Sequence, residues 1–194
     1  MHFLIDGAED AAHTFLFAHG AGGAMDTSFM NIVAAGLADR GIRVVRFEFP
    51  YMAARRTSGK RGAPDRQPVL LDTFRSVVEE HGGGGKVSVG GKSMGGRMAS
   101  MIADEVGARA LVVFGYPFHP PGKPQQTRTA HLEDLRTPAL ILQGTRDMFG
   151  TRDDVATYTL SPAIRMEWME GGDHSLKGRV PEAIEAAATY LIGH

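Results

Sequence analysis

The chain has 194 residues, of which 43% are hydrophobic and 22% are charged, so we expect residues 1–194 to form a single globular domain with a sizeable core. Its net charge of −1 gives no field that favours binding to nucleic acid or to an anionic membrane surface. The sequence has no cysteine, which excludes disulfides, thiolate metal sites and a cysteine nucleophile.

The first 20 residues lack the basic segment and the long apolar run that make up a secretory signal. No apolar stretch in the chain approaches the ~18 residues that a membrane-spanning helix needs. We therefore expect a cytoplasmic protein that has neither a membrane nor a nucleic acid as its partner.

Short apolar runs, each ended by glycine or proline, alternate with segments of helical length. The expected strands, in chain order, are 14–18, 43–49, 86–90, 110–114, 139–143 and 164–169. The expected helices that follow them are 29–37, 69–80, 94–106, 153–158 and 181–192. Two segments, 51–67 and 115–137, do not fit this alternation, and both follow strand ends.

Strands that are apolar at successive positions are buried on both faces, which is typical of a parallel sheet covered by helices. The sequence thus predicts an α/β fold with a doubly wound, mostly parallel sheet of about six or seven strands. Ligand chemistry in such folds lies at the carboxyl ends of the strands.

The stretch KVSVGGKSMGG at 86–96 fits two different motifs. A phosphate-binding loop ending in GKS needs a glycine at position 86, which is occupied by Lys86, and its middle residues alternate like a strand. The G-x-S-x-G nucleophile elbow fits without a gap around Ser93. A sharp strand-to-helix turn at Ser93 requires small neighbours, a need that Gly91 and Gly95 meet.

A catalytic serine needs a histidine base and a carboxylate that orients it, which follow in the order Ser, Asp, His in this type of fold. Asp147 and His174 each follow an expected strand, so we predict that they join Ser93 in a catalytic triad. Taken singly, Ser93 is also compatible with an incidental turn residue, Asp147 with a helix cap and His174 with a surface histidine. We expect Asp173 to shape the loop of His174.

Two backbone N–H groups are candidates for binding an oxyanion beside Ser93. Met94 follows the serine at the start of a helix, and Ala21 lies in the glycine-rich stretch HGAGG at 19–23. Gly22 is the alternative to Ala21. We expect His19 to be a structural hydrogen-bonding residue.

These motifs together resemble those of the α/β-hydrolases: HGAGG at 19–23, GKSMGG at 91–96, GTRD at 144–147 and GDHS at 172–175. The resemblance covers about residues 14–192. Within the family, the sequence resembles most specifically the small capless, dienelactone-hydrolase-like proteins. It implies an α/β-hydrolase fold without a cap domain, with 3–5 as the one N-terminal antiparallel strand. Dienelactone hydrolases proper use a cysteine nucleophile, from which this chain departs. We expect no cofactor and no metal ion.

The segment 55–66 concentrates basic residues in a chain that is otherwise nearly neutral. It is either a solvated loop or an electropositive rim that selects a carboxylate- or phosphate-bearing ester. In the second case Arg55, Arg56 and Lys60 bind substrate.

The expected function is hydrolysis of a small carboxylic ester or lactone by a serine hydrolase. A thioesterase or peptidase would use the same triad. The alternative is a non-catalytic interaction module with the hydrolase fold, because the resemblance includes relatives that act as non-catalytic subunits.

Overall fold

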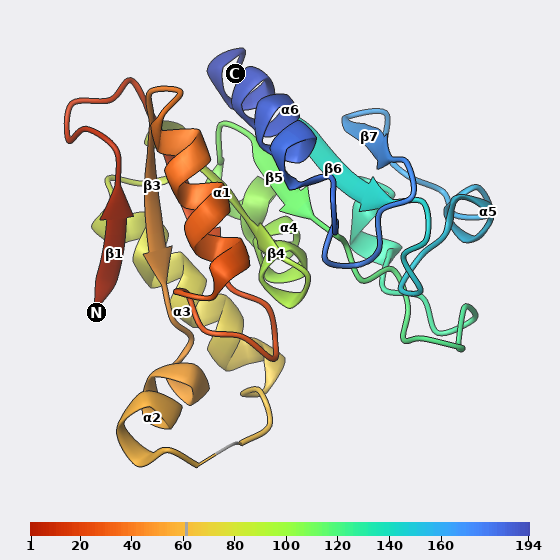
Figure 1. Cartoon of the computed structure of the whole chain (residues 1–194), viewed down its shortest axis with the longest axis horizontal. Helices are drawn as coiled ribbons and strands as arrows, with labels where there is room; N and C mark the ends of the chain where they lie inside the picture. The colour runs from red at the N-terminus through yellow and green to blue at the C-terminus, as the bar shows by residue number, and fades with distance from the viewer. Residues whose placement is uncertain (61) are drawn as a thin grey trace.

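The computed structural model describes residues 1–60 and 62–194. In this part of the chain, seven strands form one sheet in the order β1-β3-β2-β4-β5-β6-β7 (Figure 1). All neighbours are parallel except β1, which pairs antiparallel with β3. The strands are β1 Phe3–Asp6, β2 His13–Ala18, β3 Ile42–Phe47, β4 Val87–Lys92, β5 Leu111–Phe114, β6 Ala139–Gly144 and β7 Ile164–Met169.

Helices cover both faces of the sheet, as Figure 1 shows, with α1 and α6 on one face and α3 and α4 on the other. Two short 3₁₀ turns, η1 and η2, complete the elements. The helical elements are α1 Ser28–Ala38, α2 Pro50–Ser58, α3 Gln67–Glu80, η1 Gly84–Lys86, α4 Met94–Val106, η2 Ala130–Leu132, α5 Arg152–Val155 and α6 Val180–Ile192.

Strand β2 illustrates why successive positions of a central strand are apolar. Phe15 and Phe17 pack with α1 and α6, while Leu16 and Ala18 pack with α3 and α4. All four side chains are fully buried. Alternate side chains thus enter two separate cores, and the fold class predicted from the sequence is confirmed.

Three expectations for the elements were wrong in detail. The strand expected at 43–49 is β3 Ile42–Phe47, and Pro50, which was expected to stop it, opens α2, where its missing N–H and fixed φ suit the first helical turn. Strand β4 continues to Lys92, directly before Ser93. The helix expected at 153–158 is the shorter α5, which Thr151 begins with a reciprocal capping box.

No helix in the described part of the chain is long and apolar enough to cross a membrane. One residue of the basic segment, Arg61, lies outside the described residues.

Gly90 in β4 lies where the sheet leaves no room for a side chain. A Cβ atom at this position would be 2.0 Å from the Val112 carbonyl oxygen and 2.7 Å from the Phe15 ring. We therefore expect Gly90→Ala to lower the free energy of unfolding, measured in urea, by about 3 kcal/mol or more. Gly85→Ala is the matched control, because no heavy atom lies within 4 Å of its added Cβ. Equal stability of the two variants would contradict this packing.

Candidate active site

Ser93 occupies a strained turn between β4 and α4. Its φ of 52° and ψ of −116° are unusual for a residue with a side chain. The turn brings backbones so close that a Cβ at Gly91 or Gly95 would lie 2.6 or 2.5 Å from the Ala18 carbonyl oxygen. A Cβ at Gly96 would lie 2.3 Å from a Val113 methyl carbon. The glycines therefore make the turn possible, as the sequence motif predicts.

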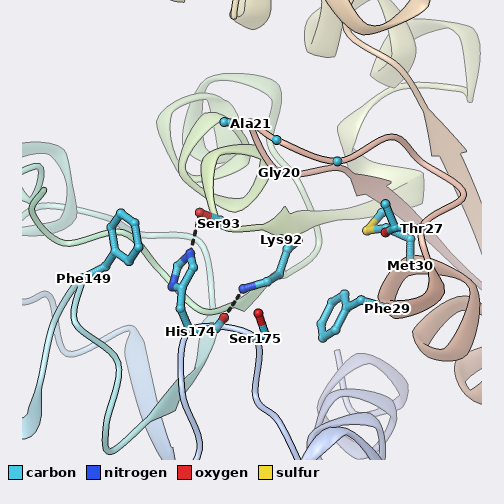
Figure 2. Close-up of a pocket in the computed structure, with 12 residues that line it drawn as sticks. Gly20, Ala21, Thr27, Phe29, Met30, Lys92, Ser93, Phe149, His174 and Ser175 are labelled. Carbon is cyan, nitrogen blue, oxygen red and sulfur yellow. Dashed lines mark hydrogen bonds between the residues drawn. The ribbon is translucent and has the colours of Figure 1, made fainter. Parts of the chain in front are cut away.

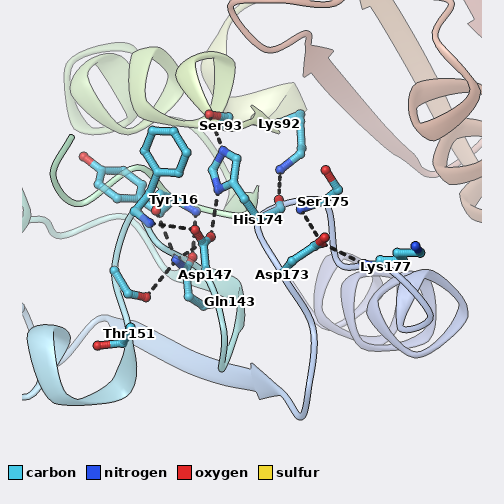
Figure 3. Close-up of polar contacts among 12 residues, drawn as sticks. Lys92, Ser93, Tyr116, Gln143, Asp147, Thr151, Asp173, His174, Ser175 and Lys177 are labelled. Carbon is cyan, nitrogen blue, oxygen red and sulfur yellow. Dashed lines mark hydrogen bonds and ion pairs between the residues drawn. The ribbon is translucent and has the colours of Figure 1, made fainter. Parts of the chain in front are cut away.

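The structure brings the three residues of the predicted triad together. His174 Nε2 lies 2.8 Å from Ser93 Oγ, and His174 Nδ1 lies 2.7 Å from Asp147 Oδ2 (Figure 3). Asp147 is fully buried, while the His174 side chain keeps 21% of its surface exposed. With Nδ1–H donating to the carboxylate, Nε2 is free to accept the serine proton.

Asp147 receives two further hydrogen bonds that hold its carboxylate in place. The Phe149 N–H donates to Oδ1 at 2.9 Å, and Gln143 Nε2 donates to Oδ2 at 2.9 Å. Gln143 is itself held, because its Oε1 accepts the Tyr116 N–H at 2.8 Å. Sequence reasoning missed Gln143, although a glutamine that ends the buried run ALILQ was a signal for a satisfied polar group.

Glycines also allow the loops of Asp147 and His174 to touch. A Cβ at Gly144 would lie 2.3 Å from the Gly172 carbonyl oxygen, and one at Gly115 would lie 2.8 Å from the His174 carbonyl oxygen. The Arg146 N–H bonds the Gly172 carbonyl at 2.9 Å. The loops of Asp147 and His174 are thus fixed to each other as well as to Ser93.

A cavity of about 350 Å³ opens beside Ser93 and His174 (Figure 2). Its wall includes Ala21 and Gly22 of the glycine-rich loop, and Met94 is the first residue of α4. Their roles as oxyanion donors stay a prediction. The Tyr51 hydroxyl of α2 donates to the Ala21 carbonyl at 2.9 Å, so the unexpected helix holds this loop.

His19 and Asp173 have the structural positions expected from the sequence. His19 is fully buried, its Nδ1 contacts the Gly20 carbonyl at 2.7 Å, and its Nε2 accepts the Phe49 N–H at 3.2 Å. Burial lowers the pKa of His19 below its usual value, which keeps the ring neutral. Asp173 Oδ1 accepts the N–H groups of Ser175 and Lys177 and so shapes the loop around His174.

A second serine–histidine pair joins α4 to η2. Ser100 Oγ lies 2.8 Å from His131 Nε2 and 2.8 Å from the Arg97 carbonyl oxygen. Burial and the nearby Arg97 lower the pKa of His131 to about 4. In the described structure no carboxylate bonds His131, and Ser100 is buried within regular helix. This pair lacks the orienting acid and the strained turn that Ser93 has.

The basic residues of the predicted rim lie apart from the cavity beside Ser93. Arg56 on α2 forms 2.7 Å ion pairs with Glu48 and Asp26, which occupy its guanidinium. Arg55 lines a neighbouring hollow of about 340 Å³, and Lys60 is exposed after the helix. Anion selection by these residues stays a prediction.

No group of three or more potential metal-ligating side chains occurs among residues 1–60 and 62–194.

Solved structures with the same fold include several hydrolases. An alpha-beta serine hydrolase homologue from Coxiella burnetii is 21% identical, with a TM-score of 0.76 over 97% of this chain and 90% of that one. A serine hydrolase without lid from Xanthomonas campestris is 20% identical, with a TM-score of 0.73 over 98% and 88%. Dienelactone hydrolase from Anabaena variabilis is 18% identical, with a TM-score of 0.74 over 99% and 91%.

The sequence itself matches the profile of the alpha/beta hydrolase domain over residues 11–190. That range contains Ser93, Asp147, His174 and six of the seven strands. The chain therefore belongs to the alpha/beta hydrolase family.

Proposed function

We propose that the protein is a serine hydrolase that cleaves a small carboxylic ester or lactone. The observation that carries this proposal is the continuous relay from Ser93 Oγ through His174 to the buried Asp147, with separations of 2.8 and 2.7 Å. The relay opens on a cavity of about 350 Å³, a size at the small end of ligand sites.

In the proposed reaction, Ser93 Oγ attacks the carbonyl carbon while His174 Nε2 takes its proton. Asp147 stabilises the imidazolium, and the N–H groups of Ala21 and Met94 bind the oxyanion. His174 then gives the proton to the leaving alcohol. Water, activated by the same imidazole, hydrolyses the acyl-enzyme and restores Ser93.

The alternative is a non-catalytic interaction module that keeps the fold. Catalysis is favoured because Ser93 retains a strained backbone that a binding module does not need. The same triad also serves thioesters and peptides. An ester is favoured over a peptide because an alcohol leaves more readily than an amine.

We expect a fluorophosphonate probe to label the wild-type protein and not the Ser93→Ala variant, as measured by intact mass. Hydrolysis of 4-nitrophenyl acetate should fall by up to about 10⁶-fold in kcat for this variant. Ser100→Ala is the matched control, since Ser100 also contacts a histidine, and it should keep the label. Labelling that survives in Ser93→Ala would disprove the proposed nucleophile.

The rate should fall on acidification, because a protonated His174 has no free electron pair for the Ser93 proton. The measurement is kcat/KM for a neutral ester as the pH is lowered by about three units from about pH 8. A flat profile in an assay limited by chemistry would remove His174 from the role of base.

A further inference from the structure

The cavity beside Ser93 has an uneven chemical lining. Phe29, Met30 and Phe149 supply apolar walls, glycines 20, 22 and 23 supply backbone, and Thr27 and Ser175 supply hydroxyl groups. Lys92 is the one lysine or arginine among the lining residues, and none of them is an aspartate or a glutamate. A negatively charged group that entered this cavity would therefore meet one cation and no lining carboxylate.

Two contacts hold the ammonium group of Lys92, a residue that lines the cavity. Its Nζ donates a hydrogen bond to the His174 carbonyl oxygen (Figure 2) and lies 5.5 Å from the centroid of the Phe29 ring. An ammonium group has three N–H donors, so two remain after the bond to His174. In the described structure, no carboxylate forms an ion pair with Lys92.

The two carboxylates whose charge acts on Lys92, those of Asp147 and Asp173, already accept hydrogen bonds from other donors. Asp147 receives its bonds from Gln143, Phe149 and His174, and Asp173 receives the N–H groups of Ser175 and Lys177. Burial lowers the pKa of Lys92 to about 8, against the opposing attraction of Asp147 and Asp173. An ammonium group in this position gains stability when an anion binds beside it.

Helix α1 adds a second feature of positive polarity to the same cavity. Thr27, its N-cap, and Phe29 and Met30 of its first turn all line the wall. The Thr27 side chain makes no capping bond, and the first turn has no acidic residue. The positive end of the helix dipole is therefore not neutralised by a side chain of its own.

We propose that the cavity binds a carboxylate through Lys92 and the start of α1, so that the ester cleaved at Ser93 belongs to a substrate with a second, free carboxylate. This inference rests on the proposed hydrolase function and names the substrate class for it. In this proposal Lys92 selects the charge of the substrate inside the cavity, whereas Arg55, Arg56 and Lys60 lie outside that cavity.

The kinetic test compares two esters of equal shape and different charge. These are the mono-4-nitrophenyl ester of adipic acid, which ends in a carboxylate, and the matching ester of adipic monoamide, which ends in a neutral carboxamide. We expect kcat/KM at pH 7 to be about tenfold higher for the carboxylate. Equal values for the two esters would overturn the inference, while turnover of the neutral ester would leave the hydrolase function intact.

Two variants separate the role of Lys92 from a general effect of charge. Lys92→Met keeps the length of the side chain and should bring the ratio of the two kcat/KM values to about one. Because Lys92 also holds the His174 carbonyl, both values should fall, and the ratio is the informative quantity. Lys177→Met removes an exposed charge from the same loop region and should leave the ratio unchanged. If Lys92→Met still prefers the carboxylate ester about as strongly as the wild type, Lys92 is not the residue that selects the charge.

A binding measurement tests the inference without catalysis and without replacing Lys92. Calorimetric titration of the Ser93→Ala protein should give tighter binding of hexanoate than of hexanamide at pH 7. The difference should disappear by about pH 9.5, because Lys92 loses its charge as the pH rises through about 8. Equal binding at pH 7 would overturn the inference even if the esters are hydrolysed. If Ser93 resists the fluorophosphonate probe, this titration still decides whether the cavity selects a carboxylate.

Discussion

The buried carboxylate of Asp147 is the interaction on which the candidate site depends. A fully buried charge is stable only when hydrogen-bond donors surround it, and Asp147 has three of them. They come from the end of β6, from the loop after it and from the loop after β7. Through Gln143 the network also reaches Tyr116 after β5. Satisfying one carboxylate therefore ties together the carboxyl ends of three neighbouring strands, and His174 extends this network to Ser93 after β4.

The second constraint is the absence of side chains where these loops meet. Gly144 lies against Gly172, and Gly115 lies against the carbonyl of His174. A methyl group at either position would push the imidazole away from the serine. The site thus combines strong polar contacts with backbone approaches that glycine alone permits. Gly91 and Gly95 are likewise free of side chains, and this allows the sharp turn after β4 that presents Ser93.

Much of this fold was predictable because its strands are buried on both faces and end in glycine or proline. The run TFLFA predicted β2, and GGKSMGG predicted both the strand-to-helix turn and its serine, because each pattern has a local physical cause. Helix α2 was not predicted, because a proline after an apolar run is as compatible with the end of a strand as with the start of a helix. The ion pairs of Arg56 with Glu48 and Asp26 join positions that only the tertiary structure brings together. The position of Lys92 in the cavity wall was missed for the same reason.

The sheet order has a consequence for how the proposed activity relates to folding. Strand β7, which leads to His174, lies at an edge and pairs with β6 alone, whereas β4, which leads to Ser93, lies between two strands. Edges of sheets open locally at lower energetic cost than their centres. Transient fraying of β7 would withdraw the imidazole of His174 from Ser93. The proposed chemistry therefore depends on a strand that opens more readily than the centre of the sheet, so we expect heat or denaturant to remove it before the fold itself.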